Sequence, residues 1–170
     1  MNPLNIYPVK NDKLLAYFKN FNFKKNTKHV QNYLKITIES GTLYQTTFHD
    51  AFNFLKDESF GFVALRMSNG EIDDVPGVIV DFLYLKEEYR AKLIEGTEQK
   101  YSFFILDYII EKAIEIQSLA AVNHVYLVPI NDKVRAVYLE YGFENIPSSG
   151  TNEWEDYMVF NLLDEDPSII

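Results

Sequence analysis

Two side chains that can exchange protons stand out in this 170-residue chain, Tyr138 and Asp81. Tyrosine and aspartate both serve as acids or bases in enzymes when their surroundings hold them in the required protonation state. Tyr138 lies near the end of a short segment with helical spacing of apolar residues, and Asp81 interrupts an otherwise apolar segment. The elements that contain these two residues therefore decide what chemistry is available to the chain.

The segment around Tyr138 has the start and stop signals of one short helix. Asn131 or Asp132 can accept hydrogen bonds from the first amides of this helix, and Gly142 can end it. Four residues between these signals fall at i, i+3, i+4 and i+7 and predict a helix lying on a sheet: Val134, Val137, Tyr138 and Tyr141. A tyrosine on such a stripe is also an ordinary core residue with its hydroxyl at the surface, so the pattern leaves both roles open.

The segment around Asp81 predicts a central strand over Gly77–Leu85, because nearly all of its residues are apolar. An unpaired buried carboxylate costs several kcal/mol, so Asp81 must be paired, protonated, or exposed to a wet cleft that tunes its pKa. We hypothesise that Asp81 acts as a general base. The alternative, that it pairs with a lysine, an arginine or backbone amides, is equally open at this stage.

The remaining segments predict an α+β fold, described more loosely as three-layer α/β/α, in which helices flank a mixed central sheet. The C-terminal two thirds give, in order, a strand over Phe60–Met67, a turn at 68–71, the strand over Gly77–Leu85, a polar connector to Lys100, a helix from about Ser102 to Ser118, a strand over Val125–Ile130, the short helix, and a strand over Tyr157–Leu163.

The N-terminal third is less regular. Two helices are expected within residues 1–40, over Asn11–Phe21 and Val30–Ile38, and Leu43–Leu55 favours a strand in part. Residues 164–170 are expected to form a frayed tail. We expect residues 1–170 to form a single domain, since this length suffices for one core.

One motif resembles a known family. Asn131 and Tyr138, followed by Gly142 and Phe143 directly after a strand and helix, resemble the last conserved segment of the GNAT superfamily of coenzyme A-dependent N-acyltransferases. The resemblance implies that acetyl-CoA donates an acetyl group to a primary amine, which attacks it directly. It also implies that Asn131 lies near the cofactor and that Tyr138 gives a proton to the departing thiolate.

The cofactor loop matches this family less well. GNAT proteins follow the central strand with Arg/Gln-x-x-Gly-x-Gly/Ala, where amides at a helix start approach a pyrophosphate. Here the loop is longer and contains only Gly96, with Lys100 and Ser102 at the places of the two small residues. By resemblance, the cofactor-binding residues are Leu83, Tyr84 and Leu85 at the strand end, then Arg90, Lys100, Tyr101, Ser102 and Phe103. If the loop no longer binds coenzyme A, the chain is a GNAT-like binding or regulatory protein without catalysis.

Composition limits the partners. The chain has no cysteine, which excludes disulfides and thiolate chemistry, and no segment has the length and apolarity of a membrane span, so a cytoplasmic protein is expected. His29, His49 and His124 lack metal-ligand spacing, and we predict no metal site. The oligomeric state is open, a homodimer included.

The acceptor is the least determined partner. A small-molecule or peptide amine is expected, and residues 76–83 also resemble a bacterial branch that includes toxin-type acetyltransferases acting on aminoacyl-tRNA. The net charge of −9 argues against RNA, whereas six lysines within the first 28 residues argue for it.

Overall fold

The fold is given by a computed structural model that describes residues 5–8, 32, 35–37, 39–40, 43–47, 59–68, 70, 72, 75–147 and 156–164. The strands are β1 (Asn5–Pro8), β2 (Leu43–Thr47), β3 (Ser59–Met67), β4 (Gly77–Leu85), β5 (His124–Leu127), β6 (Glu144–Asn145) and β7 (Met158–Asn161). The helices are α3 (Tyr101–Gln117) and α4 (Asp132–Tyr141), with short 3-10 helices η2 (Glu87–Tyr89) and η3 (Leu162–Asp164).

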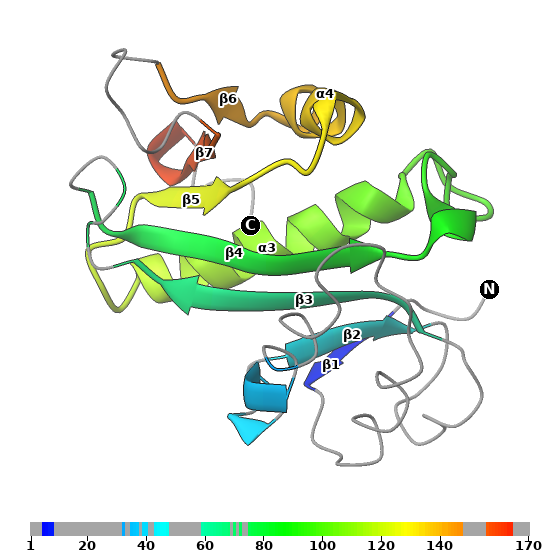
Figure 1. The fold of residues 1–170 in the computed structure, drawn as a ribbon, viewed down its shortest axis with the longest axis horizontal. Helices are drawn as coiled ribbons and strands as arrows, with labels where there is room; N and C mark the ends of the chain where they lie inside the picture. The colour runs from blue at the N-terminus through cyan, green and yellow to red at the C-terminus, as the bar shows by residue number, and fades with distance from the viewer. Residues whose placement is uncertain are drawn as a thin grey trace. The chain divides into compact units, whose positions relative to one another are not determined.

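Within these described ranges the strands form one mixed sheet in the order β1-β2-β3-β4-β5-β7-β6 (Figure 1). β4 and β5 run parallel, whereas β1–β2, β2–β3, β5–β7 and β6–β7 are antiparallel. The amide of Ser68 donates to the carbonyl of Gly77 at 2.7 Å and closes the hairpin between β3 and β4. The predicted α+β class, with helices flanking a mixed sheet, is confirmed.

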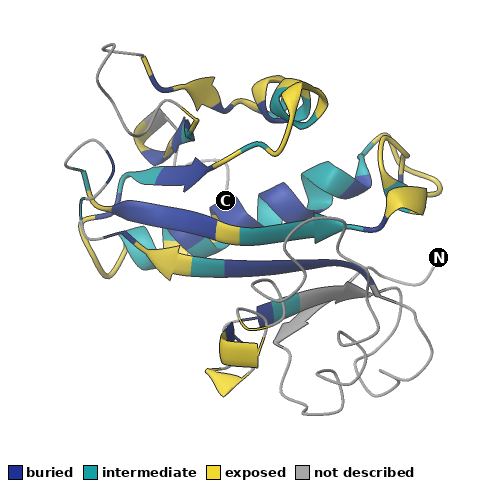
Figure 2. Ribbon diagram, viewed as in Figure 1, coloured by how far each residue is buried: buried dark blue, intermediate teal, exposed yellow. Residues whose placement is uncertain are grey.

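The chain divides into two compact units, and the long strands β3 and β4 contribute residues to both. The first unit comprises Met1–Ala64 and Phe82–Lys92, and the second comprises Leu65–Asp81 and Leu93–Ile170. In the first unit β2 pairs with the first half of β3, where Leu43, Phe60 and Phe62 are fully buried (Figure 2). The expectation of one domain stays a prediction.

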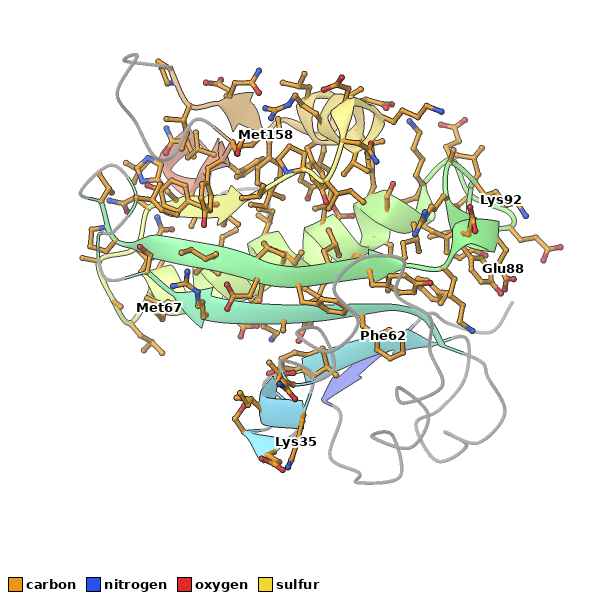
Figure 3. The ribbon with its side chains drawn as sticks, viewed as in Figure 1. Lys35, Phe62, Met67, Glu88, Lys92 and Met158 are labelled. Atoms are coloured by element: carbon orange, nitrogen blue, oxygen red, sulfur yellow. The ribbon has the colours of Figure 1, made fainter. Side chains whose placement is uncertain are left out.

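The second unit has its core between α3 and the strands that it covers. α3 packs along β5 and buries Ile105, Leu106 and Ile109, as its dense apolar pattern predicts (Figure 1). Met158, labelled in Figure 3, is fully buried on β7. Gly77 is required for close packing, since a Cβ there would lie 2.5 Å from Cε2 of Tyr126.

Most predicted elements of the second half agree with the structure. The strands over Phe60–Met67 and Gly77–Leu85 are found, and α3 begins and ends one residue before its predicted limits. The predicted strand over Val125–Ile130 was wrong at its end: β5 stops at Leu127, and Val128 and Ile130 are exposed. The backbone leaves the sheet before Pro129, which cannot donate to a strand ladder.

The remaining differences concern short or terminal elements. The predicted strand over Tyr157–Leu163 was too long, because η3 replaces its last residues, and sequence patterns missed β1 and β6. β2 confirms the expected partial strand, and the described residues between 32 and 39 are helical. The predicted helix over Asn11–Phe21 and the tail from 165 onward lie outside the described residues. No described helix has the length and apolarity needed to cross a membrane.

Candidate active site

Tyr138 lies on the inner face of α4 and is 8% exposed. Among the described residues its hydroxyl has no hydrogen-bond partner. Burial raises the pKa of Tyr138 to about 12, so the hydroxyl holds its proton throughout the physiological range. It is a proton or hydrogen-bond donor there, and not a base.

The caps of α4 are those that the sequence predicts. Asn131 is the N-cap, and its Oδ1 accepts from the amide of Val134 at 3.0 Å. Gly142 ends the helix with φ at +123°, a conformation that residues with side chains rarely adopt. Because its side-chain oxygen caps the helix, the observed role of Asn131 is to stabilise the start of α4. Its expected proximity to a cofactor stays a prediction.

The start of α3 has no side-chain cap. Lys100 is the N-cap residue, but no side chain caps this helix, and Tyr101, Ser102 and Phe103 form its first turn. The amides of a first helical turn have no partner inside the helix and carry partial positive charge. Ser102, which stands at the place of a small residue of the family loop, lies inside the helix, one residue after its start.

Lys100 is held by a carboxylate that the sequence did not reveal. Its ammonium forms an ion pair with Glu140 of α4 and lies 5.1 Å from the ring centre of Phe103. Glu140 follows Lys100 by 40 residues, so only the packing of α3 and α4 brings the two charges together. The cation expected to offset phosphate charge is thus already paired in the structure.

The loop before α3 forms a compact turn. Leu93 and Lys100 make an isolated antiparallel bridge, and Ile94 is buried beneath it. The Thr97 hydroxyl donates to the Ile94 carbonyl at 3.0 Å, and Gly96 has φ at +75°. The single glycine of this loop is therefore used to make the turn.

Asp81 is paired with an arginine. The Arg66 Nε atom donates to Asp81 Oδ1 at 2.7 Å, from the neighbouring strand of the hairpin. Of the alternatives that the sequence left open for this carboxylate, pairing is found, and Asp81 is also exposed. The registered pairs of β4 with β5 end at Ile79 and Tyr126, two residues before Asp81. A base role for Asp81 stays a prediction, and it now has to operate beside Arg66.

The expected residues of the first unit lie at the end of β4. Leu83, Tyr84 and Leu85 are half-buried, and Arg90 is exposed. The Arg90 Nε donates to the Leu85 carbonyl at 2.9 Å, and its guanidinium lies 5.8 Å from the Tyr84 ring centre. Burial raises the pKa of Tyr84, while the charge of Arg90 acts in the opposite direction. Glu88 and Lys92 project from the segment that follows β4 (Figure 3).

Tyr138 on α4 and the start of α3 both belong to the second unit. Two further acidic residues, Glu140 and Asp107, connect these helices and were missed, since neither belongs to the family motif. No group of three or more metal-ligating side chains occurs in the described part of the chain. His29 and His49 lie outside it.

No family model matches the chain, and no curated protein matches it. Several solved structures do match the chain. The crystal structure of AtaTR bound with AcCoA has 13% identity, a TM-score of 0.66 and 96% of each chain covered. The KacTA–DNA complex has 14% identity and a TM-score of 0.62, covering 95% of this chain and 94% of that chain. AtaT complexed with acetyl-methionyl-tRNAfMet has 14% identity and a TM-score of 0.64, covering 94% of this chain and 95% of that chain.

Structural similarity at such low sequence identity shows the fold alone. The chain has the fold of the GNAT superfamily, over nearly its whole length. Which activity this fold supports here depends on the residues of the site.

Proposed function

We propose that this protein is an N-acetyltransferase that transfers an acetyl group from acetyl-CoA to a primary amine by direct attack. The observation that carries the proposal is Tyr138, which is nearly buried, protonated at neutral pH and without a partner among the described residues. A hydroxyl in this state is prepared to donate to a group that binds beside it. The likeness to AtaTR bound with AcCoA supports the choice of donor.

The reaction needs two proton movements. Acetyl-CoA supplies an acyl thioester; the amine nitrogen forms a bond to the acyl carbon, and the carbon–sulfur bond breaks. The nitrogen must lose a proton and the sulfur must gain one. A free thiol has a pKa of about 8.5, so Tyr138, with a pKa of about 12, stabilises the departing sulfur chiefly as a hydrogen-bond donor. Tyr138 keeps its own proton, and the proton lost by the nitrogen balances the one gained by the sulfur.

The second unit contains the groups that we propose for binding one end of the donor. The first turn of α3 offers amides and the positive end of a helix, the arrangement that binds phosphate groups in many proteins. Tyr101, Ser102 and Phe103 would supply these amides, and Lys100 would add charge after release from Glu140. The roles expected for Asn131, and for Leu83, Tyr84, Leu85 and Arg90 in the first unit, stay predictions.

The amine also needs a group that accepts its proton. Asp81 is the candidate, and its ion pair with Arg66 holds its carboxylate in one place. Asp81→Asn keeps the size of the side chain and removes its charge. A variant that retains full activity at every pH would remove Asp81 from the mechanism, whereas loss of activity with unchanged acetyl-CoA affinity supports it.

For the acceptor we propose the amine of an aminoacyl-tRNA, with a small-molecule or peptide amine as the other candidate. The AtaT complex with acetyl-methionyl-tRNAfMet has the same fold over nearly the full length of both chains. The net charge of −9 therefore does not decide against RNA. The six lysines of the first 28 residues all lie outside the described residues. An RNA acceptor predicts binding that weakens steeply with added salt, because phosphate contacts release counterions.

The test is acceptor-dependent release of coenzyme A thiol, measured with aminoacyl-tRNA, peptides and small amines in parallel. Tyr138→Phe should lower turnover while acetyl-CoA affinity stays nearly unchanged. Tyr108→Phe on α3 is the matched control, since it removes the same atom from a half-buried tyrosine. An unaltered rate in Tyr138→Phe contradicts the donor role.

Two observations favour a second function, a GNAT-fold binding or regulatory protein without catalysis. Lys100 is neutralised by Glu140, and the single loop glycine, Gly96, is used in a turn. Both features reduce what the α3 start offers to phosphate. Calorimetry separates the two functions, because only the enzyme needs measurable affinity for acetyl-CoA.

A further inference from the structure

A carboxylate joins the last turn of α4 to the first half of α3. The Tyr141 hydroxyl donates to Asp107 Oδ1 at 2.7 Å, and Gln99 Nε2 donates to Asp107 Oδ2 at 2.5 Å. Each oxygen of the half-buried carboxylate thus holds one donor. Hydrogen bonds to a charged acceptor are stronger than neutral ones and are directional. Tyr141 is therefore fixed by its hydroxyl as well as by its ring.

The ring of Tyr141 is the centre of an aromatic cluster. It meets Phe103 of α3 edge-on, with ring centres 5.2 Å apart, and lies 6.0 Å from both Phe143 and Phe160. Phe143 and Phe160 are 5.3 Å apart. α3, α4 and β7 all contribute to this cluster, so a change in the position of Tyr141 is transmitted to each of them.

Tyr138 depends on this cluster for its own position. It precedes Tyr141 by three residues, which places both on one face of α4. Among the described residues its one ring contact is with Phe143, 5.9 Å between centres, and its hydroxyl makes no hydrogen bond that would fix it. The packing of its ring and the placement of α4 therefore set where the Tyr138 hydroxyl lies.

We propose that Asp107 is a positioning residue for Tyr138, acting through the hydroxyl of Tyr141. Asp107 does not touch the reacting atoms; it holds the last turn of α4 in register with α3 so that the Tyr138 hydroxyl points to one place. This proposal rests on the function proposed above. The ion pair between Lys100 and Glu140 joins the same two helices. Loss of the Asp107 contact should therefore loosen α4 without unfolding the unit.

Tyr141→Phe is the sharpest perturbation, because it removes the hydroxyl and keeps the ring. A displacement of a catalytic group by about 1 Å can cost up to about a hundredfold in rate, so we expect turnover to fall by about tenfold. The acetyl-CoA affinity should change little. Asp107→Leu should behave similarly. Asp107→Asn should keep most of the activity, since its amide oxygen can accept from Tyr141 and its amide nitrogen can donate to Gln99 after the Gln99 amide rotates.

A double-mutant cycle separates positioning from general damage. If Asp107 and Tyr141 act through Tyr138, Tyr141→Phe has no further effect on turnover in a Tyr138→Phe background. Merely structural damage would reduce turnover by the same factor in both backgrounds and would overturn the proposal. Tyr108→Phe serves again as the control and should leave turnover unchanged.

A readout independent of activity keeps the inference distinct from the proposed function. The protein is labelled with 13C-tyrosine, and the ring resonance of Tyr138 is assigned by its loss in Tyr138→Phe. This resonance should shift or broaden in Tyr141→Phe. In Asp107→Asn it should keep the position that it has in the unaltered protein. An unchanged Tyr138 resonance in Tyr141→Phe overturns the positioning claim even if the enzyme is active. Absence of acetyl transfer by the unaltered protein contradicts the proposed function, and the resonance then decides whether Asp107 places Tyr138.

Discussion

Replacing Tyr138 by phenylalanine should change how stability depends on alkaline pH. Burial raises the pKa of Tyr138 from its ordinary value of 10.0 to about 12. Between these values the unfolded chain loses the proton of this hydroxyl while the folded protein keeps it. The contribution of Tyr138 to stability is therefore fully present below pH 10 and is lost as the pH rises towards 12.

The size of the effect follows from the separation of the two pKa values. Each pH unit corresponds to ~1.4 kcal/mol, so the complete loss is about 3 kcal/mol, of which about 1 kcal/mol has disappeared by pH 11. Phenylalanine has no proton to lose and keeps the ring contact with Phe143. The other ionisable groups are common to both proteins and cancel in the comparison.

The assay is urea unfolding of both proteins at pH 8, 10 and 11. The unaltered protein should lose about 1 kcal/mol more than Tyr138→Phe between pH 8 and pH 11. Equal losses in the two proteins would refute the reasoning, because they would mean that the hydroxyl is not desolvated in the folded state. The same pKa predicts that Tyr138 produces no alkaline fall in turnover below about pH 11.

Three further predictions follow from individual contacts. Gly77→Ala should lower the free energy of unfolding by about 1–3 kcal/mol, since the new Cβ would lie 2.5 Å from the fully buried Tyr126 ring and 2.8 Å from the His124 carbonyl; an unchanged urea midpoint would contradict this packing. Ala91→Gly should raise stability by up to about 1 kcal/mol, because Ala91 has φ at +57°, which is strained for an alanine; a lower melting temperature would exclude that strain. Glu140→Gln should strengthen acetyl-CoA binding by up to about fivefold, the range of an exposed ion pair, because it releases Lys100. Glu111→Gln removes the same charge from the exposed surface of α3 and should have no effect. Equal affinities in these two variants and the unaltered protein would mean that Glu140 does not compete for Lys100.

The sequence predicts those parts of the fold that depend on local pattern. The apolar run Gly77–Leu85, the helix start at Asn131 and its end at Gly142 are all found, because burial, capping and positive φ each restrict residue type strongly. The strand predicted to run to Ile130 was wrong, since apolar side chains alone do not distinguish a buried strand from exposed residues that follow one.

Local sequence patterns do not predict contacts between elements that lie far apart in the chain. Arg66 could have been suspected as the partner of Asp81, because both lie on strands joined by one turn. The pairing of Tyr141 with Asp107 and of Lys100 with Glu140 could not, since these partners are 34 and 40 residues apart and meet only after α3 and α4 pack. The two features that most affect the proposed site therefore required the fold.

Calorimetric titration of the purified protein with acetyl-CoA tests the central claim most directly. We predict a dissociation constant in the micromolar range, weakened in Lys100→Gln and nearly unchanged in Tyr138→Phe, because the first residue lies at the start of α3 and the second acts on the departing sulfur. No detectable heat at millimolar acetyl-CoA would contradict the enzyme and leave the GNAT fold as a scaffold for another partner.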